Sequence, residues 1–281
     1  MKTKAFPLAG HRLTVAYAGT TFFGWQRQAG HPSIQEEIEK VLARIWGRPI
    51  TLEGSGRTDT GVHAVGQVAS FTAPRKLPAP TLLRALNDHL PFPIRVTRVD
   101  FLEPTFHARF DVRAKSYEYR IRNALFSDPF EIDRVWHIPV PLDLAKMEAA
   151  AALLRGKHDF AAMATNAGYA RTTTVRTVSA LELRRRGPFL TVRITADGFL
   201  YHMVRNIVGA LVKVGKGKLP VDEFRAVFVG GKRTLAPASA PAFGLYLMKV
   251  EYYPKAVRLV RALNRRPPQA FDGVDNGADD E

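Results

Sequence analysis

Two hydrophobic periodicities alternate along the chain, and this alternation constrains the fold more than any other feature of the sequence. Residues 33–46 carry the helical pattern, because Ser33 and Glu36 form a capping box ahead of one apolar face. Residues 12–17 instead alternate apolar and polar side chains, as a half-buried strand does. The same patterns predict further strands at 62–71, 95–101, 117–122, 174–184, 189–195 and 245–253, and further helices at 81–90, 142–154 and 200–214. The sequence therefore predicts an α+β fold.

The predicted elements divide into two α+β halves with mostly antiparallel strand pairing. We expect an N-terminal half at 1–110 and a C-terminal half at 111–254, although no internal repeat is visible in the sequence. Residues 255–281 contain a Pro-Pro pair followed by an Asp- and Gly-rich end. We expect this tail to be disordered.

The chain has 281 residues and no cysteine. Disulfide scaffolds, thiolate nucleophiles, cysteine-ligated zinc and iron–sulfur clusters are therefore excluded. The histidines show no i,i+4 pair, so we expect no metal site. Pro7 and Gly10 interrupt the N-terminal segment, and no apolar stretch is long enough to cross a membrane. These features predict a soluble, cytoplasmic protein with no membrane partner.

A strong excess of basic residues gives the first indication of function. The chain contains 41 Lys+Arg against 26 Asp+Glu, a formal net charge of +15. Basic and acidic residues balance within 255–281, so the whole excess lies on residues 1–254. A folded body with this charge attracts polyanions, and nucleic acid is the first candidate. A basic protein without such a partner would carry the same charge, so charge alone does not decide between them.

Residues 54–61, with the sequence Gly-Ser-Gly-Arg-Thr-Asp-Thr-Gly, are the densest candidate for chemistry. The glycines permit positive φ angles and a close approach of the backbone to a ligand. Both the P-loop lysine and the third glycine of a dinucleotide fingerprint are missing. The Asp-Thr-Gly at 59–61 matches aspartic proteases, but their chemistry needs two carboxylates, so only a dimer could supply it. The structural alternative is a hairpin turn with a solvated Asp59.

Two segments, 22–28 and 106–110, interleave aromatic side chains with arginine. Such aromatic rings either stack on unpaired bases or plug a loop against the core. Arg205 lies inside an apolar run that is predicted to be helical. A buried arginine is costly unless a carboxylate pairs with it, so Asp59 is its candidate partner. The alternative is that Arg205 faces the solvent.

Seven motifs in consecutive order over residues 12–253 together resemble those of the bacterial tRNA pseudouridine synthase A family. They are YxGTxFxGWQ at 17–26, GRTDxGVHA at 56–64, FHARF at 106–110, KxYxY at 115–119, LxGxHDF at 154–160, GFLYHMVRNIVG at 198–209 and APAxGLYL at 240–247. Four positions depart from the residues usual in that family: Ala18, Phe22, Thr60 and Met163.

The resemblance implies the pseudouridine synthase fold, an α+β fold with two similar α/β halves around a long, mainly antiparallel sheet. It also implies a homodimeric isomerase that acts in tRNA processing and RNA modification. The reaction would detach uracil from C1′ of a uridine, rotate the base and rejoin it through C5. The implied substrates are the uridines at tRNA positions 38, 39 and 40, in the anticodon arm, with the tRNA running over a basic cleft. The family needs neither a cofactor nor a metal.

The resemblance also implies roles for five residues. Asp59 would be the catalytic carboxylate, which attacks C1′, attacks C6 or removes a sugar proton; these alternatives stay open. Tyr117 would stack on the uracil and help with proton transfer. Arg205 would pair with Asp59 and keep it ionised and oriented. Leu245 would wall the pocket, and Arg57 would fill the gap left by the unstacked uridine.

Three other hypotheses account for part of the sequence. A non-catalytic RNA-binding protein or RNA chaperone would share the charge and the aromatic residues, but it would not need Asp59. A dimeric aspartic hydrolase would need Asp59, but it would not need the basic body. A pseudouridine synthase with a different RNA target would need both.

Overall fold

The α+β fold expected from the sequence is confirmed by the structure, a computed structural model that describes residues 8–74, 77–165, 173–229 and 239–257. Ten strands form one sheet in the order β4-β1-β3-β10-β5-β9-β8-β7, with β2 beside β3 and β6 beside β5. The strands are β1 (Leu8–Tyr17), β2 (Glu53–Gly54), β3 (His63–Pro74), β4 (Ile94–Leu102), β5 (Val112–Asn123), β6 (Trp136–Ile138), β7 (Gly156–Asp159), β8 (Val175–Arg186), β9 (Phe189–Ala196) and β10 (Leu245–Tyr252).

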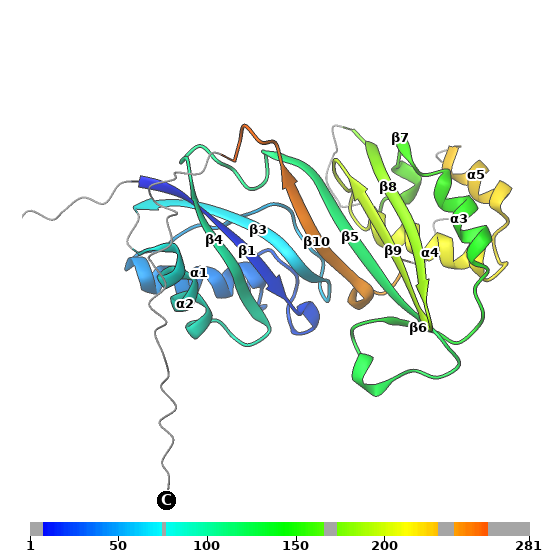
Figure 1. The fold of residues 1–281 in the computed structure, drawn as a ribbon, viewed down its shortest axis with the longest axis horizontal. Coiled ribbons are helices and arrows are strands. Elements are labelled where there is room, and N and C mark those ends of the chain that lie inside the picture. The colour runs from blue at the N-terminus through cyan, green and yellow to red at the C-terminus, as the bar shows by residue number, and fades with distance from the viewer. Residues whose placement is uncertain (1–7, 75–76, 166–172, 230–238, 258–281) are drawn as a thin grey trace, which may run out of the picture.

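The helices lie on one face of this sheet, behind the strands in Figure 1. They are α1 (Ile34–Trp46), α2 (Ala79–His89), α3 (Leu144–Ala152), α4 (Met203–Gly215) and α5 (Val221–Val229). Helices α1 and α2 belong to the first part of the chain, and α3, α4 and α5 to the second. Their apolar sides bury a core that also takes the inward-facing residues of the strands.

Local sequence signals explain where α1 begins and ends. The Ser33 side chain accepts a hydrogen bond from the Glu36 backbone N–H at 3.3 Å, which satisfies one of the free N–H groups of the first turn. Gly47 ends the helix in the left-handed conformation, at a φ of 68°. Ile34, Ile38 and Leu42 point into the core. The helix predicted at 33–46 is therefore confirmed almost to the residue.

The last strand, β10, lies in the middle of the sheet and joins its two parts (Figure 1). It pairs antiparallel with β5 over most of its length. Its start runs parallel to the start of β3, where Tyr246 lies beside His63 and Leu247 beside Ala64. The β5–β6 pair is also parallel, and the remaining pairs are antiparallel. The parallel pairing of β3 with β10 places the loop before β3 next to the second half of the chain.

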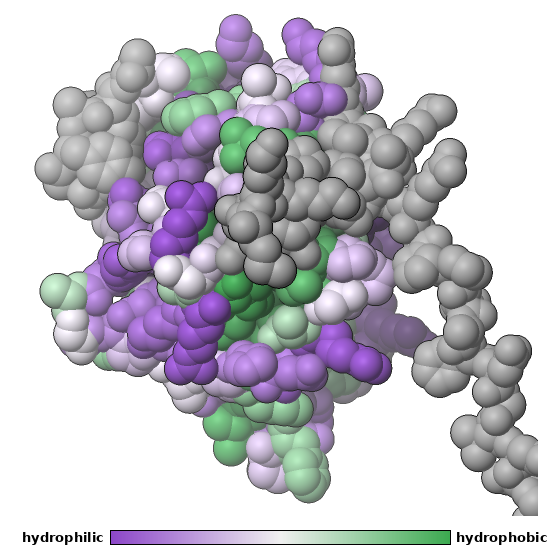
Figure 2. All heavy atoms as spheres, turned by 90° about the vertical axis from the view of Figure 1, so that its left-hand side faces the viewer, coloured by the Kyte–Doolittle hydropathy of each residue, from purple (hydrophilic) through white to green (hydrophobic). Residues whose placement is uncertain are grey.

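The structure adds elements that the sequence pattern did not predict, notably β6, β7 and α5. The predicted helix at 200–214 begins later, at Met203. The tail at 255–281 lies mostly outside the described residues, and the division at 110/111 stays a prediction. None of the described helices is both long and apolar enough to span a membrane. Figure 2 shows the end of the molecule that carries α1 and α2, where hydrophilic side chains predominate over the described surface.

Candidate active site

Asp59 lies on the loop between β2 and β3, and the segment that contains Gly24 shapes this loop. The Trp25 backbone N–H donates to the Thr58 carbonyl oxygen at 3.1 Å. Gly24 has a φ of 83°, and a Cβ at this position would come within 2.5 Å of the same carbonyl. Only glycine fits such a conformation and such a close approach. The loop therefore rests on backbone contacts and leaves the Asp59 side chain 25 % exposed.

The structure brings Arg205 to Asp59. Arg205 Nη1 donates to Asp59 Oδ2 at 3.1 Å, while Nε donates to the Ala240 carbonyl oxygen at 2.8 Å. The Arg205 side chain is only 15 % exposed. The partly buried guanidinium is thus held by acceptors from two other segments of the chain, and its Nη1 donates to the carboxylate.

His202 also faces Asp59 and is a residue that the sequence reasoning missed. Its Nε2 lies 3.1 Å from Arg205 Nη1 and 3.3 Å from Asp59 Oδ2. Burial lowers the pKa of His202; Asp59 opposes this shift and Arg205 adds to it. The neutral ring accepts from Arg205 through Nε2. The histidines were considered only as metal ligands, although the i,i+3 spacing from Arg205 was a usable signal.

A second network beneath the loop was also missed, although two of its residues lie in the quoted motifs. Lys115 Nζ donates to the Ser55 carbonyl oxygen at 2.6 Å. The Gln67 amide donates to the Gly56 carbonyl at 3.0 Å, and its oxygen accepts from the Ser55 hydroxyl at 2.6 Å. Burial, with a smaller effect of Arg109, lowers the pKa of Lys115 to about 8. Strands β3 and β5 therefore both fix the start of the loop.

Tyr117 and Leu245 lie on adjacent strands near this loop. Leu245 opens β10 opposite Tyr119, and Leu247 lies opposite Tyr117, so Leu245 and Tyr117 share one face of the sheet. Both are buried. The Tyr117 ring packs edge-on against Phe199, with centroids 5.0 Å apart. Burial, with smaller contributions from Tyr17 and Asp59, raises the pKa of Tyr117 above its usual value, so the phenol stays protonated.

Arg57 is exposed, two residues before Asp59 on the same loop. Its side chain is therefore available to a ligand that approaches the loop.

The aromatic segments prove to be mainly structural. Phe22 and Trp25 are buried, so the first segment plugs the loop against the core. Phe106 is also buried and packs against Tyr252. Phe110 is exposed, with the Arg109 guanidinium 5.6 Å from its ring centroid. Phe23 of the first segment is 41 % exposed and stacks on His31, so each segment presents one aromatic ring to the solvent.

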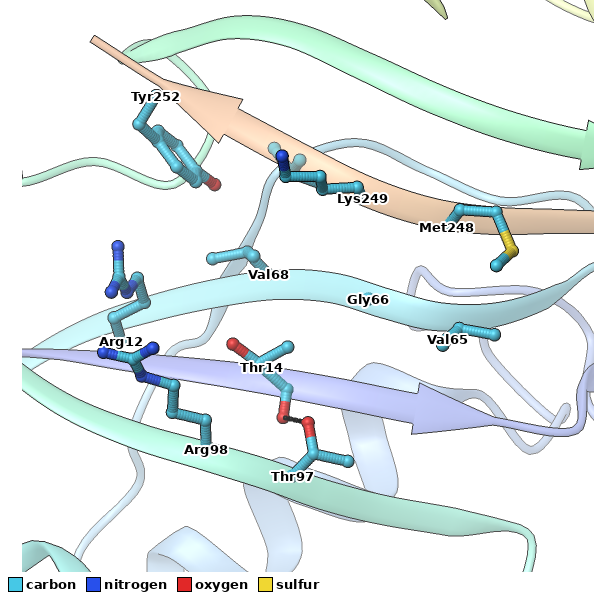
Figure 3. Close-up of a pocket in the computed structure, with 11 residues that line it drawn as sticks. Arg12, Thr14, Val65, Gly66, Val68, Thr97, Arg98, Met248, Lys249 and Tyr252 are labelled. Carbon is cyan, nitrogen blue, oxygen red and sulfur yellow. Dashed lines mark hydrogen bonds between the residues drawn. The ribbon is translucent and has the colours of Figure 1, made fainter. Parts of the chain in front are cut away.

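A hollow of about 470 Å³ lies on the helix-free face of the sheet, away from these residues (Figure 3). Side chains of β1, β3, β4 and β10 line it, including Arg12, Arg98 and Lys249. None of the five predicted site residues contributes to it. Within the described residues, no group of three or more His, Asp or Glu side chains is arranged to hold a metal ion.

Known proteins similar to this chain share most of its length. A family model described as "tRNA pseudouridine synthase" matches residues 13–111 and 150–253. A protein of Methylacidiphilum infernorum named tRNA pseudouridine synthase A is 49 % identical over 247 residues, which cover 88 % of this chain and 97 % of the relative. Proteins of the same name from Thermoanaerobacter sp. and Syntrophotalea carbinolica are 42 % and 41 % identical, over 85 % and 87 % of this chain and 98 % and 96 % of theirs. The chain therefore belongs to the tRNA pseudouridine synthase family.

Proposed function

We propose that this protein converts uridine to pseudouridine at positions 38, 39 and 40 of the tRNA anticodon stem-loop, as a cytoplasmic homodimer that uses no cofactor. The observation that carries the proposal is the Asp59–Arg205 pair, a partly exposed carboxylate held by an arginine in a strongly basic chain. The names of the relatives support tRNA as the substrate. The resemblance of the chain's motifs to those of the family supports the anticodon positions and the dimer.

The proposed reaction is an isomerisation, so it consumes no oxidant, reductant or second substrate. The N1–C1′ bond breaks and the C5–C1′ bond forms. N1 gains a proton, and C5 loses its hydrogen to the solvent. Asp59 is the proposed catalytic carboxylate, and the 25 % exposure of its side chain leaves it accessible to a nucleoside. It attacks C1′, attacks C6 or removes a sugar proton.

The surrounding residues act on the base and on the carboxylate. Arg205 orients Asp59 and offsets its negative charge, which the 3.1 Å contact supports. Tyr117 presents a protonated phenol, which suits a group that stacks on the uracil and relays a proton. Leu245 lines the same side of the sheet and excludes water from the base. The exposed Arg57 takes the space that the uridine leaves in the RNA stack.

The remaining basic residues grip phosphates. The excess charge on residues 1–254 supports this role, because phosphate contacts position an RNA without reading its sequence. Affinity for tRNA is then expected to fall steeply with salt.

Tritium release from tRNA that carries 5-tritiated uridine tests the reaction directly, because C5 loses its hydrogen only when it becomes the new glycosidic carbon. We expect release with the wild type and none with Asp59→Asn, while both bind tRNA equally. Tight binding by the wild type without release would support the non-catalytic RNA-binding hypothesis. Release by Asp59→Asn at the wild-type rate would remove Asp59 from the centre of the reaction.

The substrate positions need a separate test. Transcripts of one tRNA in which the uridines at 38, 39 and 40 are all replaced by cytidine should release no tritium. Replacement of uridines elsewhere should leave the release from 38–40 intact. Undiminished release from the first transcript would indicate another RNA target.

A further inference from the structure

An exposed aromatic ring lies beside the Asp59–Arg205 pair, and the proposed reaction does not use it. It belongs to Tyr201, in the segment that links β9 to α4. Tyr201 is 41 % exposed, whereas its neighbours Leu200 and Met203 are buried. A single exposed ring is ordinary on a protein surface, so its exposure alone assigns no role. A role for Tyr201 depends instead on what surrounds it.

The segment that carries Tyr201 contacts the candidate active site at two points. Two residues before it, Phe199 packs edge-on against the Tyr117 ring, with centroids 5.0 Å apart. One residue after it, His202 Nε2 lies 3.3 Å from Asp59 Oδ2. Of these three side chains in the segment, only that of Tyr201 is classed as exposed rather than partly buried. An RNA that brings a uridine to Tyr117 and Asp59 would therefore pass close to the Tyr201 ring.

One face of the Tyr201 ring is already stacked on His202. The two ring centroids are 3.9 Å apart, and the ring planes are inclined by 26°. The backbone of His202 has a φ of 59°, in the left-handed region that residues other than glycine rarely adopt. Backbone strain of this kind is concentrated at active sites and ligand clamps. Because His202 covers one face, the exposed part of the Tyr201 ring is its other face and its edges, which leaves room for a second stack.

The stacked pair rests on a fixed support. His202 Nε2 accepts from Arg205 Nη1 at 3.1 Å, so the arginine that holds the catalytic carboxylate also holds the histidine ring. The Tyr201 carbonyl oxygen accepts from the Thr165 N–H at 3.0 Å, and the His202 carbonyl oxygen accepts from the Asn206 N–H at 2.9 Å. A ring presented on such a backbone loses little conformational freedom when a ligand stacks on it.

The chemistry of the ring indicates a nucleobase as its ligand. Asp59 and Arg205 offset each other's charge, so neither an anion nor a cation is strongly favoured beside the ring. What Tyr201 presents is a flat aromatic face. Unpaired bases stack on such faces whatever their sequence, because every base has a π-face of its own.

The base that fits best is a neighbour of the target uridine. Extrusion of the target breaks its stacking with both neighbours, which costs free energy. The roles proposed above give the target uracil to Tyr117 and the vacated space to Arg57, so the neighbouring bases have no partner yet. We propose that Tyr201 is the stacking platform for a base next to the target uridine and restores part of the stacking lost on extrusion. The inference rests on the function proposed above and adds a substrate-binding residue to the same site.

A double-mutant cycle between the ring and a base tests the proposal. The RNA is a full-length tRNA with its target uridine at position 39, ligated from two pieces so that the base at 38, 39 or 40 can be left out. Dissociation constants of the wild type, Tyr201→Leu and Tyr201→Phe are measured for the intact and the abasic tRNAs. Leucine keeps the apolar bulk but has no aromatic face, whereas phenylalanine keeps the face. Tyr253→Leu is the matched control, because Tyr253 is 48 % exposed and lies just after β10.

We expect Tyr201→Leu to bind the intact tRNA about 5- to 150-fold more weakly than the wild type, the equivalent of one base–aromatic stack. On the tRNA without the base at 38, or on the one without the base at 40, the difference should shrink to about twofold or less. Tyr201→Phe should bind every tRNA as the wild type does, and so should Tyr253→Leu.

Three results would overturn the proposal. Wild-type affinity of Tyr201→Leu for the intact tRNA would show that the ring does not contact RNA. An equal loss on the intact tRNA and on all the abasic ones would show that the ring acts within the protein, for example by supporting His202. A difference that disappears only without the base at 39 would place the ring on the target itself. A folding defect would weaken binding to every tRNA alike, so it cannot imitate the expected pattern.

Tritium release by the wild type reports the proposed reaction separately. Release without the coupling between Tyr201 and a neighbouring base would leave the proposed function standing and remove Tyr201 from it. Coupling without release would keep Tyr201 as an RNA-binding residue and remove the proposed reaction.

Discussion

Arg205 on the first turn of α4 donates to Asp59 on the β2–β3 loop, a contact that spans 146 residues of sequence. The same guanidinium donates to the Ala240 carbonyl oxygen, so three segments of the chain meet at one side chain. Because Asp59 is partly exposed, the position of its carboxylate depends on this arginine more than on burial.

The two-acceptor geometry predicts that Arg205→Lys is not conservative. An ammonium group keeps the charge but cannot hold Ala240 and Asp59 together with the planar fork of arginine. A displaced catalytic group costs about 10²-fold in rate, so we expect the single-turnover rate constant to fall by about this factor with tRNA affinity nearly unchanged. Single-turnover tritium release measures it. Arg184→Lys, at an exposed arginine of β8, is the control and should keep full activity. A rate within twofold of the wild type for Arg205→Lys would contradict the prediction.

His202 predicts an acid limb in the pH dependence of activity. Its pKa is lowered, so the ring is neutral near pH 7 and accepts from Arg205. Protonation would turn Nε2 into a donor toward Asp59 and repel the Arg205 guanidinium. We expect the single-turnover rate to fall as the pH drops below the ordinary histidine pKa of about 6.5. In His202→Asn, single-turnover rates measured from pH 5 to 8 should lose that limb. An unchanged acid limb in this variant would assign it to another group.

The backbone at His202 gives a separate prediction about stability. Its φ is 59°, in the left-handed region that asparagine tolerates and β-branched residues do not. We expect His202→Val to lose about 1–2 kcal/mol in its free energy of unfolding, and His202→Asn to lose much less. Urea unfolding at pH 8, where the histidine is neutral in both states, measures the difference. Equal losses in the two variants would show that the backbone conformation does not set the cost.

The local elements were predictable because their signals are local. The helix at α1 follows from a cap and one apolar face, and the strands follow from alternation over a few residues. The sheet order was not predictable from such patterns. The pairing of β10 with β3 rests on a two-residue register between segments about 180 positions apart. No periodicity within either segment encodes that choice.

The candidate site also contains contacts that the sequence could predict and contacts that it could not. The Asp59–Arg205 contact was a hypothesis from the sequence, because an arginine in an apolar run needs a carboxylate. The roles of His202 and Lys115 depend on distances to Asp59 and Ser55 that only the folded chain sets. The role of the aromatic motifs could not be predicted, because the sequence does not show whether Phe22 and Trp25 are buried in the core or exposed to RNA.

Tyr117 tests whether the phenol takes part in proton transfer. A tyrosine hydroxyl is protonated at neutral pH already at its ordinary pKa, and burial of Tyr117 raises the pKa further. The group therefore acts by relaying a proton through its hydroxyl, not by ionising. We expect Tyr117→Phe to keep tRNA affinity and to lose about 10²–10⁴-fold in the single-turnover rate, the usual weight of a positioned acid or base. Tyr253→Phe, at a half-exposed tyrosine just after β10, is the control. If Tyr117→Phe retains the full rate, the ring acts by stacking alone.

Lys115 predicts how stability changes at alkaline pH. Its pKa in the folded chain is about 8, below the ordinary lysine value of 10.5. Between these two values the unfolded chain binds more protons than the folded one, so the free energy of unfolding rises with pH. Because the side chain is only partly buried, we expect this residue to add on the order of 1–2 kcal/mol between pH 7.5 and 10. Urea unfolding across this range should show a smaller rise for Lys115→Met than for the wild type. Lys249→Met, at an exposed lysine on β10, should keep the full rise. If the free energy of unfolding rises equally in Lys115→Met and the wild type, Lys115 has the same pKa in the folded and the unfolded chain. Its burial beside Ser55 would then not disfavour its charged form.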